Sequence, residues 1–187
     1  MSNILQMPTK KLLLNSDLIK LTIQRLCHQL IENHKDFSNS ALLGLQPRGV
    51  FFADKIKMAL KEIANVEVPL GYLDVTFHRD DFRRGDEPLS ANKTEVDFII
   101  EDKKIILVDD VLYTGRTIRA AMDAMMAFGR PVTVELLTMI DRKYTRELPI
   151  EAKYIGKQVD SLQSQKVKVE WIEQGFKTDS IFLLTTR

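Results

Sequence analysis

The apolar residues of the chain follow two alternating periods, one typical of amphipathic helices and one typical of buried strands. A helical stripe within residues 16–34 consists of Ile19, Ile23, Leu26 and Leu30. Asn15 or Ser16 precedes this stripe as a candidate N-cap, because either side chain can accept a hydrogen bond from an unpaired backbone N–H. The apolar residues 41–45 then lead through a turn rich in helix breakers to a second helical stripe that starts at Phe52. This order predicts a helix, a strand, a tight loop and a second helix.

The second half of the chain continues the alternation. Residues 104–108 form a β-branched and apolar run of the kind found in strands that are buried on both faces. A helical stripe follows and stops at Gly129 and Pro131, and residues 132–140 are predicted to form the next strand. Helices and strands that alternate through short turns indicate an α/β protein with a central parallel sheet flanked by helices. In such a fold, ligands bind at the carboxyl ends of the strands.

Shorter segments are expected to add to this framework. Residues 68–77 have strand character, and the runs 167–171 and 181–185 predict small added β elements. The first fifteen residues suit an arm or a short strand. Because the chain has no repeats or linker and is of ordinary domain length, we predict one domain over residues 1–187.

One long polar stretch interrupts the alternation. Residues 78–95 are rich in charged side chains and contain the breakers Gly85 and Pro88. Loops of this length inside a domain are usually functional or without fixed structure. We therefore expect an exposed, functional loop here.

Composition and charge exclude several broad classes of protein. Lys and Arg number 27 against 26 Asp and Glu, so the chain lacks the strongly basic balance of a dedicated nucleic-acid binder. The single cysteine, Cys27, allows no internal disulfide and lies on the buried side of its helix. No apolar run is long enough for a signal peptide or a membrane span, and the three histidines show no metal-ligand spacing. We expect a soluble, cytoplasmic protein.

The segment IILVDDVLYTGRT, residues 105–117, carries the most specific chemistry. The turn from Tyr113 to Thr117 opens a helix, so its backbone N–H groups and the helix dipole favour a phosphate monoester. Gly115 permits close approach of the ligand, and the hydroxyl groups of Thr114 and Thr117 can donate hydrogen bonds. The turn is therefore a candidate phosphate site.

Two adjacent carboxylates, Asp109 and Asp110, stand at the end of the strand that precedes this turn. They can accept the two vicinal hydroxyl groups of a sugar whose 5'-phosphate fills the turn, and they favour positive charge on its ring. The alternative is that both acids only cap the turn and that Gly115 is an ordinary turn glycine. The segment matches neither the GxxxxGK[ST] loop nor the GxGxxG fingerprint.

LVDDVLYTGRT resembles the 5-phosphoribosyl diphosphate signature of type I phosphoribosyltransferases. The sequence beyond this motif is similar to the PyrR family, which couples uracil phosphoribosyltransferase activity with attenuation of pyrimidine genes through RNA binding. Further matching segments are LQPRG at 45–49, HRDDF at 78–82, AAMDAMMAFGRP at 120–131, IDR at 140–142, RELPI at 146–150 and YIGK at 154–157. The resemblance implies the type I phosphoribosyltransferase fold and covers nearly the whole chain.

The resemblance also implies a role for each part of the site. Asp109 and Asp110 would hold the ribose hydroxyl groups and act in catalysis, and the 5'-phosphate would be held by Tyr113, Thr114, Gly115, Arg116 and Thr117. The loop around Arg48 and Gly49 would grip pyrophosphate. Residues 78–95 would be a flexible flap whose cations are Arg79 and Arg83 or Arg84. The alternative is that Arg48 and the flap arginines are ordinary solvated surface residues without a ligand.

The reaction implied is displacement of pyrophosphate from the anomeric carbon by a ring nitrogen of the base, giving UMP from uracil. Magnesium would be held mostly by substrate oxygens and water, which explains why the sequence shows no acidic cage. Purine-using relatives carry an aspartate where this chain has Tyr113, so uracil is the expected base, with walls of its pocket near residues 140–142. The alternatives are hypoxanthine or orotate.

A regulator that senses uridine nucleotides by binding an mRNA leader, with little catalysis, is the other hypothesis. The positions that match RNA-contacting residues of the family are Arg25, His28, Arg146 and Lys157. Glu151 replaces a basic residue of relatives, and Tyr144 lies where one residue is inserted, so we expect transferase activity with reduced or lost RNA binding. The alternative to RNA contact is that His28 binds no ligand and that Lys157 is an ordinary solvated lysine. The family also implies a homo-oligomer, a dimer or higher.

Overall fold

The computed structural model describes residues 9–76, 93–162 and 164–185. Its largest sheet has five parallel strands in the order β3-β2-β4-β5-β6. These strands are β2 (Ser40–Leu45), β3 (Leu70–Leu73), β4 (Lys104–Leu112), β5 (Thr133–Lys143) and β6 (Tyr154–Asp160). The parallel sheet and its α/β alternation confirm the predicted fold class.

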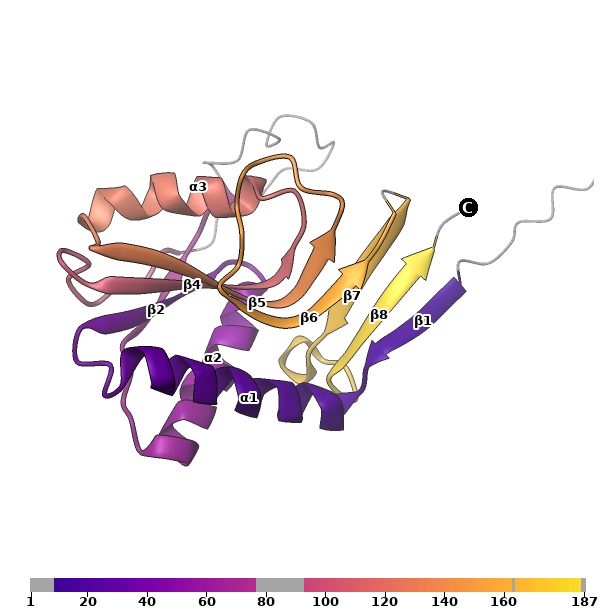
Figure 1. Cartoon of the computed structure of the whole chain (residues 1–187), viewed down its shortest axis with the longest axis horizontal. Helices are drawn as coiled ribbons and strands as arrows, with labels where there is room; N and C mark the ends of the chain where they lie inside the picture. The colour runs from indigo at the N-terminus through magenta and orange to yellow at the C-terminus, as the bar shows by residue number, and fades with distance from the viewer. Residues whose placement is uncertain (1–8, 77–92, 163, 186–187) are drawn as a thin grey trace, which may run out of the picture.

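Helices cover both faces of this sheet, as Figure 1 shows, with α3 on one side and α1 and α2 on the other. They are α1 (Ser16–His34), α2 (Gly49–Ala64) and α3 (Arg116–Met125), the last extended by the short 3-10 turn η3 (Met126–Phe128). Alternate residues of β4 point to opposite faces: Ile106 and Val108 belong to the core on the α1 and α2 side, whereas Ile105 and Leu107 belong to the core under α3. The apolar run of β4 is therefore buried on both faces.

The first helix begins where its capping chemistry predicts. The side chain of Asn15 accepts a hydrogen bond from the Leu18 N–H at 2.9 Å, so Asn15 rather than Ser16 is the N-cap. The predicted apolar stripe of α1 is buried. None of the helices in the described part of the chain is long and apolar enough to cross a membrane.

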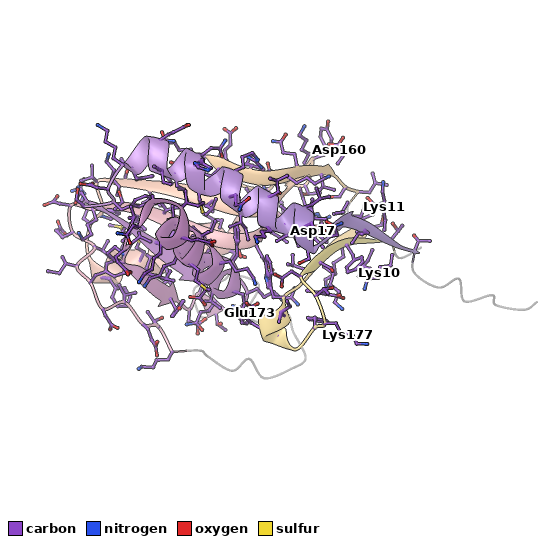
Figure 2. The ribbon with its side chains drawn as sticks, turned by 90° about the horizontal axis from the view of Figure 1, so that it is seen from below. Lys10, Lys11, Asp17, Asp160, Glu173 and Lys177 are labelled. Atoms are coloured by element: carbon purple, nitrogen blue, oxygen red, sulfur yellow. The ribbon has the colours of Figure 1, made fainter. Side chains whose placement is uncertain are left out.

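A second, antiparallel sheet of three strands closes one end of the molecule (Figure 1). It has the order β1-β8-β7 and consists of β1 (Thr9–Leu14), β7 (Gln165–Glu170) and β8 (Ser180–Thr185). This sheet contains the predicted N-terminal strand and both predicted C-terminal β elements. In Figure 2, Lys10 and Lys11 mark β1, and Glu173 and Lys177 mark the connection between β7 and β8, which includes the 3-10 turn η4 (Ile172–Gln174).

The small sheet is joined to the main body through α2. Trp171, which is fully buried, stacks on Phe52 of α2 with ring centroids 6.2 Å apart. The Lys55 ammonium lies 2.8 Å from Glu173 and 2.9 Å from Asp179. These contacts fix the C-terminal strands against the same helix whose first turn faces the candidate site.

Several strand boundaries differ from the sequence prediction, and one strand was not predicted. β3 is shorter than residues 68–77, because Asp74 accepts hydrogen bonds from the Thr76 N–H and hydroxyl and turns the chain out of the sheet. β4 continues beyond residue 108, since Asp109 still pairs with Thr138 of β5. β6 was not predicted as a strand. The predicted exposed loop lies mostly outside the described residues, apart from residues 93–95.

Candidate functional site

The two predicted acids lie side by side near the carboxyl end of β4. Asp109 and Asp110 are only 8% and 6% exposed. The Asp110 N–H donates to an Asp109 carboxylate oxygen at 2.9 Å. The extended strand therefore holds both carboxylates in a fixed relation at the edge where parallel sheets bind ligands.

One oxygen of Asp110 makes no hydrogen bond to any described residue, although it is buried. Burial raises the pKa of Asp110 to about 6, and the nearby Arg48 charge opposes this rise. A buried acceptor without a donor is unusual in a folded protein, and it is costly unless a ligand completes it. The hydroxyl group of a bound sugar has the required donor.

The predicted phosphate turn is built around a left-handed glycine. Gly115 has a backbone φ of 93°, which residues with a side chain rarely adopt. It is the N-cap of α3 and makes no side-chain hydrogen bond to the helix. The Thr114 hydroxyl lies 3.4 Å from the Arg116 N–H. We call residues 113–117 the phosphate loop, because its N–H groups and the positive end of the α3 dipole suit an anion.

The loop at the end of β2 brings a second helix N-terminus to the acid pair. A Cβ on Gly49 would stand 2.4 Å from the Val108 carbonyl oxygen and 3.0 Å from the Asp109 Cα, so only glycine fits. α2 begins at this glycine and also lacks a side-chain N-cap. Arg48 is exposed beside it, and the Gln46–Pro47 peptide bond is cis. The structure thus brings the predicted pyrophosphate loop against the acids.

The end of β5 lies beside the phosphate loop. The Arg142 guanidinium stands 3.9 Å above the ring of Tyr113 and donates to the Ser161 hydroxyl at 2.8 Å. Two further hydrogen bonds join it to the carbonyls of Leu162 and Gln165. Arg142 therefore links the phosphate loop, β5 and the connection between β6 and β7.

An open cleft of ≈ 430 Å³ adjoins this region. Its lining residues are Asp141, Arg142, Lys143, Tyr144, Arg146, Pro149, Ile150 and Glu151. The walls carry both signs of charge, so the cleft suits a polar ligand better than an apolar one.

The predicted site residues divide into three groups. Arg48, Gly49 and the segment from Asp109 to Thr117 lie together at the carboxyl edge of the sheet. The candidate flap cations, Arg79, Arg83 and Arg84, fall outside the described residues, as does the HRDDF segment.

The third group comprises the residues matched to RNA contacts. Arg25 and His28 are exposed on α1, and Lys157 is exposed on the neighbouring strand β6. The Arg25 guanidinium donates to the carbonyls of Ile155 and Gly156, at 3.1 and 2.6 Å, and so lies next to Lys157. Arg146 contacts Asp141 and the Tyr113 carbonyl instead.

The sequence reasoning missed the contacts made by Arg142 and the segment after β5. The sequence predicted residues 140–142 only as walls of the base pocket and Arg146 only as a match to RNA-contacting residues, since an arginine in a sequence does not indicate its partner. Their signal was the concentration of charge directly after a buried strand. By contrast, His34 is a structural residue, because it is buried and hydrogen-bonds Ser40 at 2.8 Å and Glu135 at 3.0 Å.

Comparison with known proteins agrees with the resemblance to phosphoribosyltransferases seen in the sequence. Residues 11–180 match the family model of the phosphoribosyl transferase domain. The bifunctional protein PyrR of Acetivibrio thermocellus is 46% identical over 161 residues, which cover 86% of this chain and 87% of the relative. The bifunctional protein PyrR of a Geobacter species is 40% identical over 175 residues, covering 94% and 98%.

A solved structure shares the architecture at low sequence identity. The hypoxanthine phosphoribosyltransferase of Trypanosoma cruzi superimposes with a TM-score of 0.70 at 15% identity, covering 95% of this chain and 97% of that one. At this identity the likeness shows the fold alone.

Proposed function

The chain belongs to the PyrR family of phosphoribosyltransferases and has the type I phosphoribosyltransferase fold, and from this we propose that it is a uracil phosphoribosyltransferase. The proposed reaction converts uracil and 5-phosphoribosyl diphosphate to UMP and pyrophosphate. The observation that carries the proposal is the buried Asp109–Asp110 pair, which has one unpaired acceptor and lies between the starts of two helices.

Each part of the substrate has a matching part of the site. The ribose hydroxyl groups would donate to Asp109 and Asp110, and the 5'-phosphate would accept from the N–H groups of the phosphate loop. Pyrophosphate would lie at the start of α2, beside Gly49 and the exposed charge of Arg48. The sugar is then held at both ends with its anomeric carbon between them, which orients it for displacement.

The acid pair also suits the transition state. A ring nitrogen of uracil bonds to the anomeric carbon while the bond to pyrophosphate breaks, so positive charge develops on the ribose ring. Fixed carboxylates near that ring stabilise the charge without having to reorganise. Asp109 and Asp110 therefore contribute both to binding and to the rate.

Magnesium fits this site mainly through the substrate. Among the residues that the structure describes, no three His, Cys, Asp or Glu side chains group as metal ligands. Mg²⁺ commonly keeps water and phosphate oxygens around it, so it needs few ligands from the protein. When bound, the ion would neutralise the leaving pyrophosphate.

The proposed choice of uracil rests on Tyr113. In purine-using relatives an aspartate takes this place, whereas here the Tyr113 ring carries the stacked Arg142 guanidinium. The walls of the base pocket would come from residues 140–142. We further propose that Arg79 and Arg83 or Arg84 are the flap cations. The proposal also includes a single domain over residues 1–187, a cytoplasmic location and a homo-oligomer.

Pyrophosphate release tests the catalytic proposal. Wild type and Asp110→Asn are compared with 5-phosphoribosyl diphosphate, magnesium and one of three bases: uracil, hypoxanthine or orotate. We expect release with uracil only, and its loss in the variant. Turnover with another base in preference to uracil would overturn the choice of base.

A second proposed function is RNA binding on the surface formed by α1 and β6. Arg25, His28 and Lys157 lie on these neighbouring elements and can meet phosphates or base edges. Glu151, which is exposed, would weaken phosphate binding near the cleft.

Titration with a pyrimidine-operon leader transcript over a range of salt concentrations tests this function. We expect binding that depends on a uridine nucleotide, that is reduced because Glu151 repels phosphates, and that weakens further when Lys157 is replaced by Gln. Binding that is absent at physiological salt, or that is equal for an unrelated RNA, would sink the proposal.

A further inference from the structure

A short segment after β5 lies directly against the phosphate loop. The backbone N–H groups of Glu147 and Leu148 both donate to the Thr114 carbonyl, at 3.0 and 3.2 Å. Ile150 packs beside them, with side-chain atoms 3.3 and 3.4 Å from where a Cβ on Gly115 would stand. We call residues 145–150 the brace segment, because it holds the Thr114 carbonyl group of the phosphate loop.

Two charged side chains of the brace segment add to these backbone contacts. Glu147 accepts from the Arg116 Nε at 2.7 Å, although both side chains are partly exposed. The Arg146 guanidinium donates to the Tyr113 carbonyl and, through its other terminal nitrogen, to the Asp141 carboxylate.

The Arg146 contact is the better shielded of the two. The side chain of Arg146 is 23% exposed and that of Asp141 is 9% exposed, against 39% and 49% for Arg116 and Glu147. Charge-assisted hydrogen bonds with little exposure to water contribute more than exposed ones. Arg146 thereby ties the phosphate loop, which follows β4, to the end of β5.

We propose that Arg146 is a positioning residue for the phosphate loop, and that it acts on the binding of 5-phosphoribosyl diphosphate rather than on contact with RNA. The identity of this ligand rests on the proposed function. Two of the five N–H donors of the guanidinium are engaged by acceptors within the protein, and the side chain is only 23% exposed, so its access to a nucleic acid is restricted. Fixing the Tyr113 carbonyl holds the following N–H groups in the orientation that a phosphate needs.

The test compares two replacements of Arg146 with one control. Arg146→Gln removes the charge and the fork, whereas Arg146→Lys keeps the charge but cannot make both contacts. Arg119→Gln is the matched control, since Arg119 is an exposed arginine of α3 paired only loosely with Asp123 at 3.8 Å. Calorimetric titration with magnesium and 5-phosphoribosyl diphosphate, without a base, measures the dissociation constant directly.

We expect Arg146→Gln to weaken binding of 5-phosphoribosyl diphosphate about tenfold and to raise its KM by a similar factor, the size expected for one lost charge-assisted hydrogen bond. The KM for uracil should rise by a smaller factor, because only the contact with Asp141 reaches the proposed base pocket, whereas the contact with the Tyr113 carbonyl acts on the phosphate loop. Arg146→Lys should recover part of the loss, and Arg119→Gln should match wild type.

Two results would overturn the inference. One is an Arg146→Gln variant that binds 5-phosphoribosyl diphosphate as wild type does but loses the leader RNA. The other is an equal rise in both KM values with a lowered Tm, which would indicate a general structural role. If wild type binds the diphosphate without turnover of any base, the proposed enzyme fails while the calorimetric comparison still decides the role of Arg146.

Discussion

We predict that the buried Asp110 carboxylate of the candidate site lowers the free energy of unfolding. Burial raises the pKa of its carboxyl from an ordinary 3.8 to about 6. The folded state therefore takes up a proton more readily than the unfolded state, so the destabilisation is absent at low pH and grows as pH rises from about 4 to about 6. At 1.36 kcal/mol for each pKa unit, the ionised carboxylate costs about 3 kcal/mol above this range.

Replacing Asp110 with Asn removes this cost while keeping the shape of the side chain. The unpaired Asp110 oxygen becomes a polar group that is still unpaired, so the charge is the main difference. We expect Asp110→Asn to raise the free energy of unfolding by up to about 3 kcal/mol at pH 8 and by about 1 kcal/mol at pH 4.5. The same variant should lose transferase activity.

Urea unfolding followed by tryptophan fluorescence measures this directly, because Trp171 is the only tryptophan and is fully buried. Asp123→Asn serves as the control, since its side chain is 59% exposed and its replacement should change stability by less than about 0.5 kcal/mol at either pH. An Asp110→Asn variant that is less stable than wild type at pH 8, or a difference that does not vary with pH, would refute the reasoning.

Two further substitutions and one chemical modification test other parts of the structure. Gly49→Ala should lower the free energy of unfolding by about 1–3 kcal/mol and raise the KM for 5-phosphoribosyl diphosphate, because the new Cβ would stand 2.4 Å from the Val108 carbonyl; urea unfolding and steady-state kinetics measure both. Arg142→Met should cost about 2–4 kcal/mol in urea unfolding, since it removes three hydrogen bonds and the stack on Tyr113; an unchanged midpoint would contradict this. Cys27 should react with a thiol reagent only after unfolding, because burial raises its pKa to about 12, and mass spectrometry of the native protein at pH 8 checks this.

The order of helices and strands could be predicted from the sequence because most of the elements are buried on a regular period. The stripe of α1 and the apolar run of β4 each match their core positions. β6 was missed because its seven residues include Gly156, Lys157 and Gln158, whose polarity hides an edge strand from a pattern based on burial. β6 is a strand because it pairs with β5, and the sequence does not show this pairing.

The candidate site could be predicted in part. The acids and the glycine turn are contiguous in the sequence, so their motif was visible. The position of Gly49 against Val108 and the contacts of Arg146 depend on segments from three different strands. Local sequence could not give them, and a resemblance alone assigned Arg146 to RNA.

The most direct test of the central claim is the amount of UMP formed from labelled uracil and 5-phosphoribosyl diphosphate with magnesium, measured together with pyrophosphate. The account predicts UMP and pyrophosphate in equal amounts with the wild-type protein, and neither with Asp110→Asn. Pyrophosphate without UMP, or UMP formation that Asp110→Asn leaves unchanged, would contradict the claim that this acid pair and phosphate loop transfer ribose phosphate to uracil.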